Sequence, residues 1–333
     1  MVALQNTVFE MKELSPQTLK YISRLVPDAH ERDSFIAVLM KGDSQERSVL
    51  WLNDRPEEMP FRIEKPFAWQ PSFVDRVSNG VKPGAHPLHE QGAYYCLDLS
   101  SVFAASSILS LNSLELRKLH AQGPTILDVC AAPGGKSIFA WQAIKPELLI
   151  CNEVIGKRSG ALISNLKRCR ILPSIVIRED SKNLAEKLAG YAELVLVDAP
   201  CSGQSLLAKG EDSPGCFHPS VINTNANRQR RILANSSHCV SGGGYLVYMT
   251  CTYAREENEG VVEWFFKKFP CFKPVAIPSH SEFQSELTSA PCYRLWPQKG
   301  MGAGAFVAMF ECQEQRAASN LDSDLRICWS SEN

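Results

Sequence analysis

Two cysteines, Cys201 and Cys251, each follow a run of apolar residues, at the point where a buried strand would end. Cys201 lies in Asp-Ala-Pro-Cys-Ser-Gly at 198–203, and Cys251 lies in Thr-Cys-Thr-Tyr at 250–253. The carboxyl ends of parallel strands meet at one edge of a sheet, where α/β proteins bind their ligands. The spacing therefore predicts an active site that contains two thiols.

A segment upstream of both cysteines favours a nucleotide cofactor. Residues 128–136, Asp-Val-Cys-Ala-Ala-Pro-Gly-Gly-Lys, form a glycine-bearing turn between an apolar strand and a helical pattern. Small residues let the backbone turn tightly and approach a ligand, and the start of the helix offers free N–H groups. The turn lacks the glycine spacing of dinucleotide sites and of P-loops, so neither NAD nor ATP is favoured.

Two acidic residues extend this cofactor site. Glu153 ends the second predicted strand, where a carboxylate can accept hydrogen bonds from ribose hydroxyls. Asp180 follows the third strand and is placed to accept from an adenine amino group. Each acid taken alone is equally well explained as a strand-end or helix-capping residue. Their joint position after successive strands favours cofactor binding.

From about residue 123 onward, apolar runs alternate with helical patterns, which predicts an α/β fold with a parallel sheet covered by helices on both faces. The expected strands lie at 125–129, 148–152, 174–177, 193–197 and 244–249. The expected helices lie at 136–144, 157–170, 181–189, 227–240 and 256–269. We also expect a long loop over 202–227 and a hairpin-like sheet edge made by 293–296 and 305–310.

The chain before this region has a different texture. It shows two short helical patterns at 15–25 and 31–40, a strand-like run at 48–53, and a proline-rich stretch through residue 87. We therefore predict a smaller N-terminal α+β module over 1–105 and the main domain over 106–312. The polar, aperiodic residues 313–333 predict a flexible tail.

Composition restricts the cellular setting. Twelve cysteines without Cys-x-x-Cys spacing, and no apolar N-terminal leader, predict a cytoplasmic protein in a reducing compartment, without a bound metal. The apolar runs fall short of the roughly twenty residues that a membrane span requires, so we expect no membrane partner. A net charge of −1 leaves the substrate open. A monomer is the default expectation.

The motifs resemble those of the Nop/Sun (Fmu-like) family of S-adenosylmethionine-dependent RNA cytosine-C5 methyltransferases. They occur in the family's order at 128–136, 198–203, 250–253, 257–259, 294–297 and 304–306. The resemblance implies a class I methyltransferase, Rossmann-like sheet, S-adenosyl-L-methionine as cofactor, and a cytosine in rRNA or tRNA as substrate. A loose match of the N-terminal module to bacterial rRNA-modifying members favours rRNA processing, with the module in contact with RNA.

The resemblance also implies roles for individual residues. Cys251 would be the nucleophile, Cys201 would release the product, and Asp198 and Lys136 would lie beside the base. The implied cofactor-binding residues are Cys130, Ala131, Ala132, Pro133, Gly134, Gly135, Lys136, Glu153, Arg158, Asp180 and Asp198. One departure concerns RNA contact, because Leu97 stands where the family usually has Gln.

The implied chemistry explains why a thiol is needed. Carbon 5 of cytosine belongs to an aromatic ring and is a poor nucleophile, whereas adding a thiolate to carbon 6 creates an enamine that accepts a methyl group at carbon 5. A free thiol with a pKa of about 8.5 is mostly protonated at neutral pH, so the surroundings must activate Cys251. The base must be single-stranded or flipped out of a helix to be reached.

Three other functions compete with this interpretation. A DNA cytosine-C5 methyltransferase would use the same chemistry with Cys201 as nucleophile and Cys251 dispensable. A methyltransferase-like RNA-binding or assembly factor would not need the intact set of catalytic side chains. Methylation of a protein or a small molecule would leave the two thiols unexplained.

Overall fold

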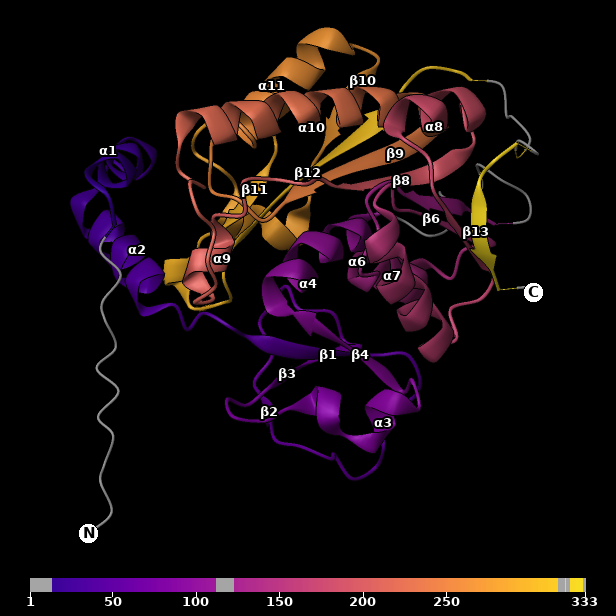
Figure 1. The fold of residues 1–333 in the computed structure, drawn as a ribbon, viewed down its shortest axis with the longest axis horizontal. Helices are drawn as coiled ribbons and strands as arrows, with labels where there is room; N and C mark the ends of the chain where they lie inside the picture. The colour runs from indigo at the N-terminus through magenta and orange to yellow at the C-terminus, as the bar shows by residue number, and fades with distance from the viewer. Residues whose placement is uncertain (1–13, 112–122, 317–320, 322–323, 332–333) are drawn as a thin grey trace.

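A sheet of nine strands forms the centre of the computed structural model, which describes residues 14–111, 123–316, 321 and 324–331 (Figure 1). Its strands are β5 (Thr125–Asp128), β6 (Leu148–Asn152), β7 (Ser174–Ile177), β8 (Ala192–Asp198), β9 (Val240–Thr250), β10 (Phe272–Val275), β11 (Tyr293–Leu295), β12 (Ala305–Cys312) and β13 (Ile327–Ser330). The strand order is β10-β12-β9-β8-β5-β6-β7-β13, and β11 pairs with β12.

Helices cover both faces of this sheet, as the alternating pattern predicted (Figure 1). One face carries α4 (Leu99–Ser106), α6 (Gly135–Ile144) and α7 (Gly156–Arg168), and the other carries α8 (Ser181–Lys187), α10 (Pro219–Cys239) and α11 (Glu259–Lys268). The apolar side of each helix is buried against the strands, which is the main stabilising contribution of this architecture. None of the described helices combines the length and apolarity that crossing a membrane requires.

The parallel strands β5, β6, β7, β8 and β9 align their carboxyl ends at one edge of the sheet. Asp198 at the end of β8 pairs with Met249 of β9, and Asp128 of β5 pairs with Leu196 of β8. The turn after β5 and the two cysteine segments after β8 and β9 therefore leave the sheet side by side. The strands predicted from the apolar runs are confirmed at all five positions.

The N-terminal part forms two separate packing units. A four-stranded antiparallel sheet of order β2-β3-β1-β4 contains β1 (Arg47–Trp51), β2 (Ile63–Glu64), β3 (Val74–Val77) and β4 (Tyr94–Asp98). Helices α1 (Pro16–Leu25) and α2 (Ala29–Lys41) pack instead against the segment that follows β9. There the ring centroids of Phe35 and Tyr253 lie 4.9 Å apart. The proposed boundary at 105/106 falls inside α4, and the division of the chain into domains stays a prediction.

The shorter elements are α3 (Pro87–Glu90), α9 (Ser205–Ala208) and 3₁₀ turns at Pro83–Ala85, Ser107–Ser110, Pro278–Phe283 and Pro297–Lys299. The loop expected over 202–227 is wrong in part, because it contains α9 and the first two turns of α10. Helix α10 begins at Pro219, where the side chain of His218 accepts the N–H of Ser220 and proline occupies the first turn.

Two expectations about the sheet edges are wrong in part, although the hairpin-like pairing of 293–296 with 305–310 is confirmed by the antiparallel pairing of β11 with β12. Strand β12 lies between β9 and β10 instead of at the edge. Within the expected flexible tail, β13 pairs antiparallel with β7, and the half-buried Trp329 packs against the main core. The short apolar pair Cys328-Trp329 thus closes the far edge of the sheet. Residues 1–13, 112–122, 317–320, 322–323 and 332–333, which include parts of the predicted N-terminal module and tail, lie outside the described residues.

A substitution of Phe265 on α11 tests how this helix packs against the large sheet. Its side chain is fully buried, and its ring lies 5.3 Å from that of Phe272 and 4.9 Å from that of Phe310. We expect Phe265→Ala to lower the free energy of unfolding by about 3–5 kcal/mol, measured by urea denaturation. The exposed Lys268→Ala on the same helix should change it by less than about 0.5 kcal/mol. Equal effects of the two variants would contradict this packing.

Candidate active site

The two thiols predicted from the sequence lie in contact at the carboxyl edge of the large sheet. The Sγ atoms of Cys201 and Cys251 are 3.3 Å apart. Cys251 is exposed and Cys201 is partly buried, so the outer sulfur is the one that a substrate can reach. At this separation one sulfur can donate its proton to the other.

The two thiols differ in acidity because they share a proton. The hydrogen bond from Cys201 lowers the pKa of Cys251 to about 7, against the opposing effect of burial. The hydrogen bond to Cys251, together with burial, raises the pKa of Cys201 well above its ordinary value. Near neutral pH, Cys251 is therefore ionised in a large share of the molecules, whereas Cys201 remains a thiol. The arrangement supplies the activation of Cys251 that a thiolate nucleophile requires.

Lys136 and Asp198 form an ion pair next to these sulfurs. The Nζ atom of Lys136 lies 2.7 Å from Oδ2 of Asp198. Burial opposes the charge on Lys136, but the negative charges of Asp198 and Cys251 outweigh it, and the pKa of the lysine is raised. The site therefore contains a fixed cation and a fixed anion beside the thiolate, a pair suited to stabilising charge on a bound heterocycle.

The turn after β5 is held open by buried hydrogen bonds. Asp128 accepts from Oγ of Ser137 at 2.6 Å and from the N–H of Cys130 at 3.3 Å. Burial raises the pKa of Asp128 to about 7. Gly134 has a φ of 111°, which favours glycine, and α6 begins directly after it. The structure thus brings residues 130–136 to the start of α6, as predicted, and adds Asp128 as the residue that shapes the turn.

Glu153 directly follows β6 at the same edge, and Arg158 lies in the first turn of α7. Oε2 of Glu153 is 3.3 Å from Nη1 of Arg158, and Nη2 of Arg158 donates to the carbonyl of Ala132 at 2.6 Å. Oε1 of Glu153 accepts the N–H of Ile155, whereas its buried Oε2 has no hydrogen-bond partner. Val154 and Ile155 beside it are 57% and 51% exposed. A buried carboxylate oxygen that is ion-paired but accepts no hydrogen bond, next to exposed apolar side chains, fits a ribose and its attached base.

Asp180 is placed differently from the other predicted cofactor residues. It is the N-cap of α8, where its Oδ1 accepts the N–H groups of Lys182 and Asn183. The hydrogen bond from Asn183, which is stronger than the opposing effect of burial, holds the pKa of Asp180 below its usual value. The capping role considered from the sequence is therefore present. Contact of Asp180 with an adenine stays a prediction.

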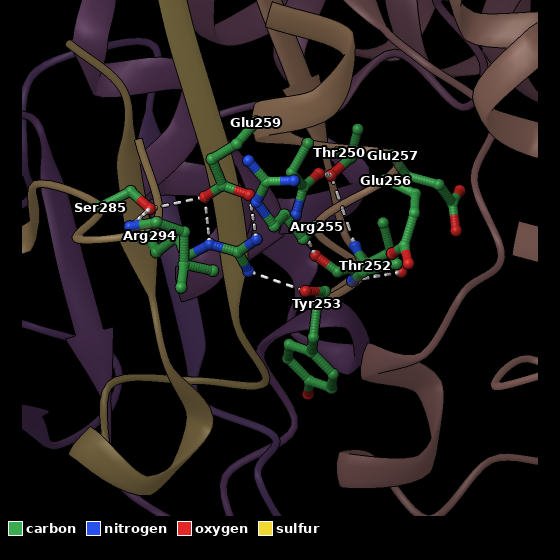
Figure 2. Close-up of polar contacts among 12 residues, drawn as sticks. Thr250, Thr252, Tyr253, Arg255, Glu256, Glu257, Glu259, Ser285 and Arg294 are labelled. Atoms are coloured by element: carbon green, nitrogen blue, oxygen red, sulfur yellow. Dashed lines mark hydrogen bonds and ion pairs between the residues drawn. The ribbon is translucent and has the colours of Figure 1, made fainter. Parts of the chain in front are cut away.

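Figure 2 shows a buried polar network that braces the segment after Cys251. Arg294 forms two hydrogen bonds with Glu259, and its Nη1 donates to the carbonyl of Tyr253 at 2.9 Å. The Arg294 and Glu259 side chains are 4% and 0% exposed, and Oγ of Ser285 donates to the same carboxylate. The pair therefore fixes the backbone two residues beyond Cys251.

Asn258 and Gln204 complete this support. The side chain of Asn258 accepts from Oγ1 of Thr250 at 2.6 Å and donates to the carbonyl of Thr252 at 2.9 Å. Gln204 accepts the N–H of Tyr253 at 3.0 Å. Sequence reasoning noted the motifs that hold Asn258, Glu259 and Arg294 but assigned these residues no role. Their proximity to the cysteine motif was the available signal.

Comparison with known proteins identifies relatives across most of the chain. The family described as 16S rRNA methyltransferase RsmB/F matches residues 117–311, more than half of the 333 residues. Ribosomal RNA small subunit methyltransferase F of Pectobacterium carotovorum is 26% identical over 274 residues, covering 79% of this chain and 54% of that protein. The chain thus spans about half the length of this relative.

Solved structures share the fold. The crystal structure of PH0851 matches with a TM-score of 0.74 and 22% identity, covering 88% of this chain and 65% of that one. The crystal structure of NSun6 from Pyrococcus horikoshii with SFG matches with a TM-score of 0.71 and 18% identity, covering 90% and 99%. The predicted class I methyltransferase sheet is confirmed by these similarities.

The contact between the sulfurs predicts the pH dependence of Cys251. Its alkylation by iodoacetamide should be slow below about pH 7, where the thiol is protonated, and should rise to a plateau above it. Cys201→Ala removes the hydrogen-bond donor and should move this midpoint to higher pH. Peptide-resolved mass spectrometry measures the rate at each pH, with Cys328→Ala on β13 as control. An unchanged midpoint in Cys201→Ala would refute the shared proton.

The buried ion pair predicts a large loss of stability when one partner is removed. Arg294→Met leaves the Glu259 carboxylate buried without its counterion, which should cost about 3–5 kcal/mol in the free energy of unfolding. Arg255→Met provides a matched control, because Arg255 pairs with Glu263 at 3.0 Å where both side chains are substantially exposed. That variant should cost at most about 1 kcal/mol by the same denaturation measurement. Similar losses of unfolding free energy in the two variants would contradict the prediction that an unpaired, buried Glu259 carboxylate is costly.

Proposed function

The chain belongs to the RsmB/F family of 16S rRNA methyltransferases, and from this premise we propose that it methylates carbon 5 of a cytosine in RNA. The observation that carries the proposal is the 3.3 Å contact between the exposed Cys251 and the partly buried Cys201. Ribosomal RNA is favoured over tRNA, because the matched relatives are named as small-subunit rRNA methyltransferases. We further propose a cytoplasmic monomer.

The proposed cofactor is S-adenosyl-L-methionine, which when bound supplies an electrophilic methyl group. The residues at the carboxyl edge fit it. The 130–136 turn offers backbone N–H groups at the start of α6, and the buried Oε2 of Glu153, which accepts no hydrogen bond, can accept one from a ribose hydroxyl. Arg158 orients that carboxylate, and Asp180 is assigned to the adenine side of the site.

Cys251 begins the proposed reaction. Its thiolate forms a bond to carbon 6 of the cytosine, and the electrons of the 5,6 double bond move toward carbon 5 and N3. In this proposal Asp198, paired with Lys136, accepts a hydrogen bond from the amino group of the base, and the positive charge of Lys136 stabilises the negative charge that develops at N3. The ring then has the nucleophilic carbon 5 that methylation requires.

Cys201 acts in the second half of the reaction. After methylation, the proton on carbon 5 must be removed, the 5,6 double bond must reform, and the bond between carbon 6 and Sγ of Cys251 must break. Cys201 lies next to the leaving sulfur and, after giving its own proton to solvent water, its thiolate can accept the carbon-5 proton directly or through a water, while Cys251 leaves as a thiolate. The exposure of Cys251 supports this assignment of roles over the DNA-type one, in which Cys201 attacks.

RNA contacts are proposed for the four-stranded sheet and for the middle of α10. Arg228 and Arg231 are exposed on α10, and Arg230 is partly buried, so the first two are available to phosphate groups. The four-stranded sheet joins the main core through Tyr95, whose ring lies close to Gly135 in the cofactor turn. This contact supports a role of the N-terminal sheet near the proposed cofactor.

Transfer of labelled methyl groups from S-adenosylmethionine to unmodified small-subunit rRNA tests the proposed function. Wild type should label cytosine, Cys251→Ala should lose more than about a hundredfold in rate, and Cys201→Ala should accumulate a protein–RNA adduct that survives denaturation. Cys328→Ala serves as a control that keeps activity. An adduct that requires Cys201 would favour the DNA-type mechanism, and transfer to tRNA alone would replace rRNA as the substrate. No transfer to either RNA, free or assembled into ribosomal particles, would contradict the proposal.

A further inference from the structure

Glu257 is fully buried between the two cysteine segments. Its Oε2 accepts the N–H of Ser202 at 2.9 Å and a hydrogen bond from Nε2 of Gln229 at 2.8 Å. The same nitrogen of Gln229 also donates to the carbonyl of Pro200 at 3.0 Å. Pro200 and Ser202 flank Cys201, so the Glu257–Gln229 pair holds the peptide groups on both sides of this cysteine.

Glu257 is anchored from the other cysteine segment. It follows Cys251 in the chain, and its own carbonyl accepts from the hydroxyl of Tyr248 at 2.6 Å. A second bridge joins the segments where Oγ of Ser202 and Oγ1 of Thr252 lie 2.7 Å apart. The carboxylate therefore sits on the Cys201 side of the pair while being fixed to the backbone that carries Cys251.

No cation neutralises this carboxylate in the part of the chain that the structure describes. Its Oε1 has no hydrogen-bond partner, and Arg228, whose charge lowers its pKa, is exposed and forms no ion pair with it. Burial raises the pKa of Glu257, and the hydrogen bonds from Ser202 and Gln229 oppose that rise. A buried charge without a counterion is costly, so its retention next to a reactive thiol calls for a functional explanation.

We propose that Glu257 is a positioning residue that determines which sulfur holds the shared proton. Its negative charge on the Cys201 side keeps the proton on Cys201 and leaves the thiolate on Cys251. The meaning of this assignment rests on the proposed function, because it makes Cys251 the atom that attacks the base.

The other ionisable groups that face the two sulfurs do not supply this asymmetry. Asp198 raises and Lys136 lowers the pKa of Cys251, and the effect of Asp198 is the larger one, so this ion pair does not favour a thiolate on Cys251. Tyr248 and Tyr253 remain neutral, because burial raises the pKa of each well above its ordinary value. Cys216 also remains a thiol, since burial raises its pKa. Glu257 is the unbalanced charge among these groups.

Alkylation of the whole protein by iodoacetamide, without RNA or S-adenosylmethionine, tests the proposal. Glu257→Gln keeps the size of the side chain and an oxygen acceptor for Ser202 but removes the charge. At about pH 7 we expect the ratio of Cys251 to Cys201 alkylation to fall by about threefold or more, with the pH midpoint of Cys201 moving down. Each cysteine is followed by peptide-resolved mass spectrometry.

Glu256→Gln is the matched control. Glu256 is adjacent in the chain and exposed, and it accepts from the hydroxyl of Tyr21 at 2.7 Å. Removing this charge should leave the alkylation ratio within about twofold of wild type, because water screens an exposed carboxylate. A ratio in folded Glu257→Gln equal to that of wild type, or an equal fall in both variants, would overturn the proposal.

A second variant covers the case in which Glu257→Gln does not fold, as judged by thermal unfolding. Glu257→Asp withdraws the carboxylate by one methylene and should give a smaller fall of the ratio in the same direction, and a folded Glu257→Asp with the wild-type ratio would count against the idea. The assay is separable from the proposed function because it needs no methyl transfer. A shifted ratio together with inactive wild type on every RNA would contradict only the proposed function.

Discussion

The site depends on the proton shared by the sulfurs of Cys201 and Cys251, which lie 3.3 Å apart. This contact exists only while the segments that carry the two cysteines keep their positions relative to each other. The register of the parallel pair β8 and β9, in which Asp198 lies opposite Met249, determines these positions. Cys201 lies three residues after the end of β8, and Cys251 directly follows the end of β9. A slip of one residue in this pairing would turn the inward side chains outward, so the buried sheet core also enforces the chemistry.

The segments beyond the strand ends are irregular, and a dense set of buried polar contacts replaces the regular ladder there. Thr252 and Tyr253 are held through their backbone by Asn258, Gln204 and Arg294. Breaking such a contact leaves an unsatisfied buried group, which costs more than the contact contributes when intact. The network therefore specifies one arrangement of the loop more than it adds to the overall stability.

Much of this arrangement was predictable from local patterns. Apolar runs marked all five parallel strands, and the position of Cys201 and Cys251 after two of them indicated a common site. Long-range packing was not predictable in this way. The run Cys328-Trp329 is too short to signal a strand, and only its contact with β7 makes it one. The start of α10 was missed although Pro219 is a common first residue of a helix.

The same limit explains why the supporting residues of the site were missed while its thiols were found. A thiol after a strand is recognisable from its neighbours, whereas the importance of Glu257 depends on Ser202 and Gln229, which are distant in the chain. Burial alone would not distinguish Glu257 from the equally buried Glu259, yet Glu259 has Arg294 as its counterion and Glu257 has none in the described structure.

The N-terminal helices α1 and α2 pack against the segment that follows Cys251 and so restrict its position. Phe35 of α2 lies edge-on to Tyr253 and 5.7 Å from Trp296, and Tyr21 of α1 donates its hydroxyl hydrogen to Glu256. Residues from α1 and α2 thus cover the segment that follows Cys251. Arg294, which lies much later in the chain, donates a hydrogen bond to the backbone of the same segment. Since no local segment contains all these contacts, the acidity of Cys251 is a property of the assembled fold, and it should be lost together with tertiary structure instead of fading with any single element.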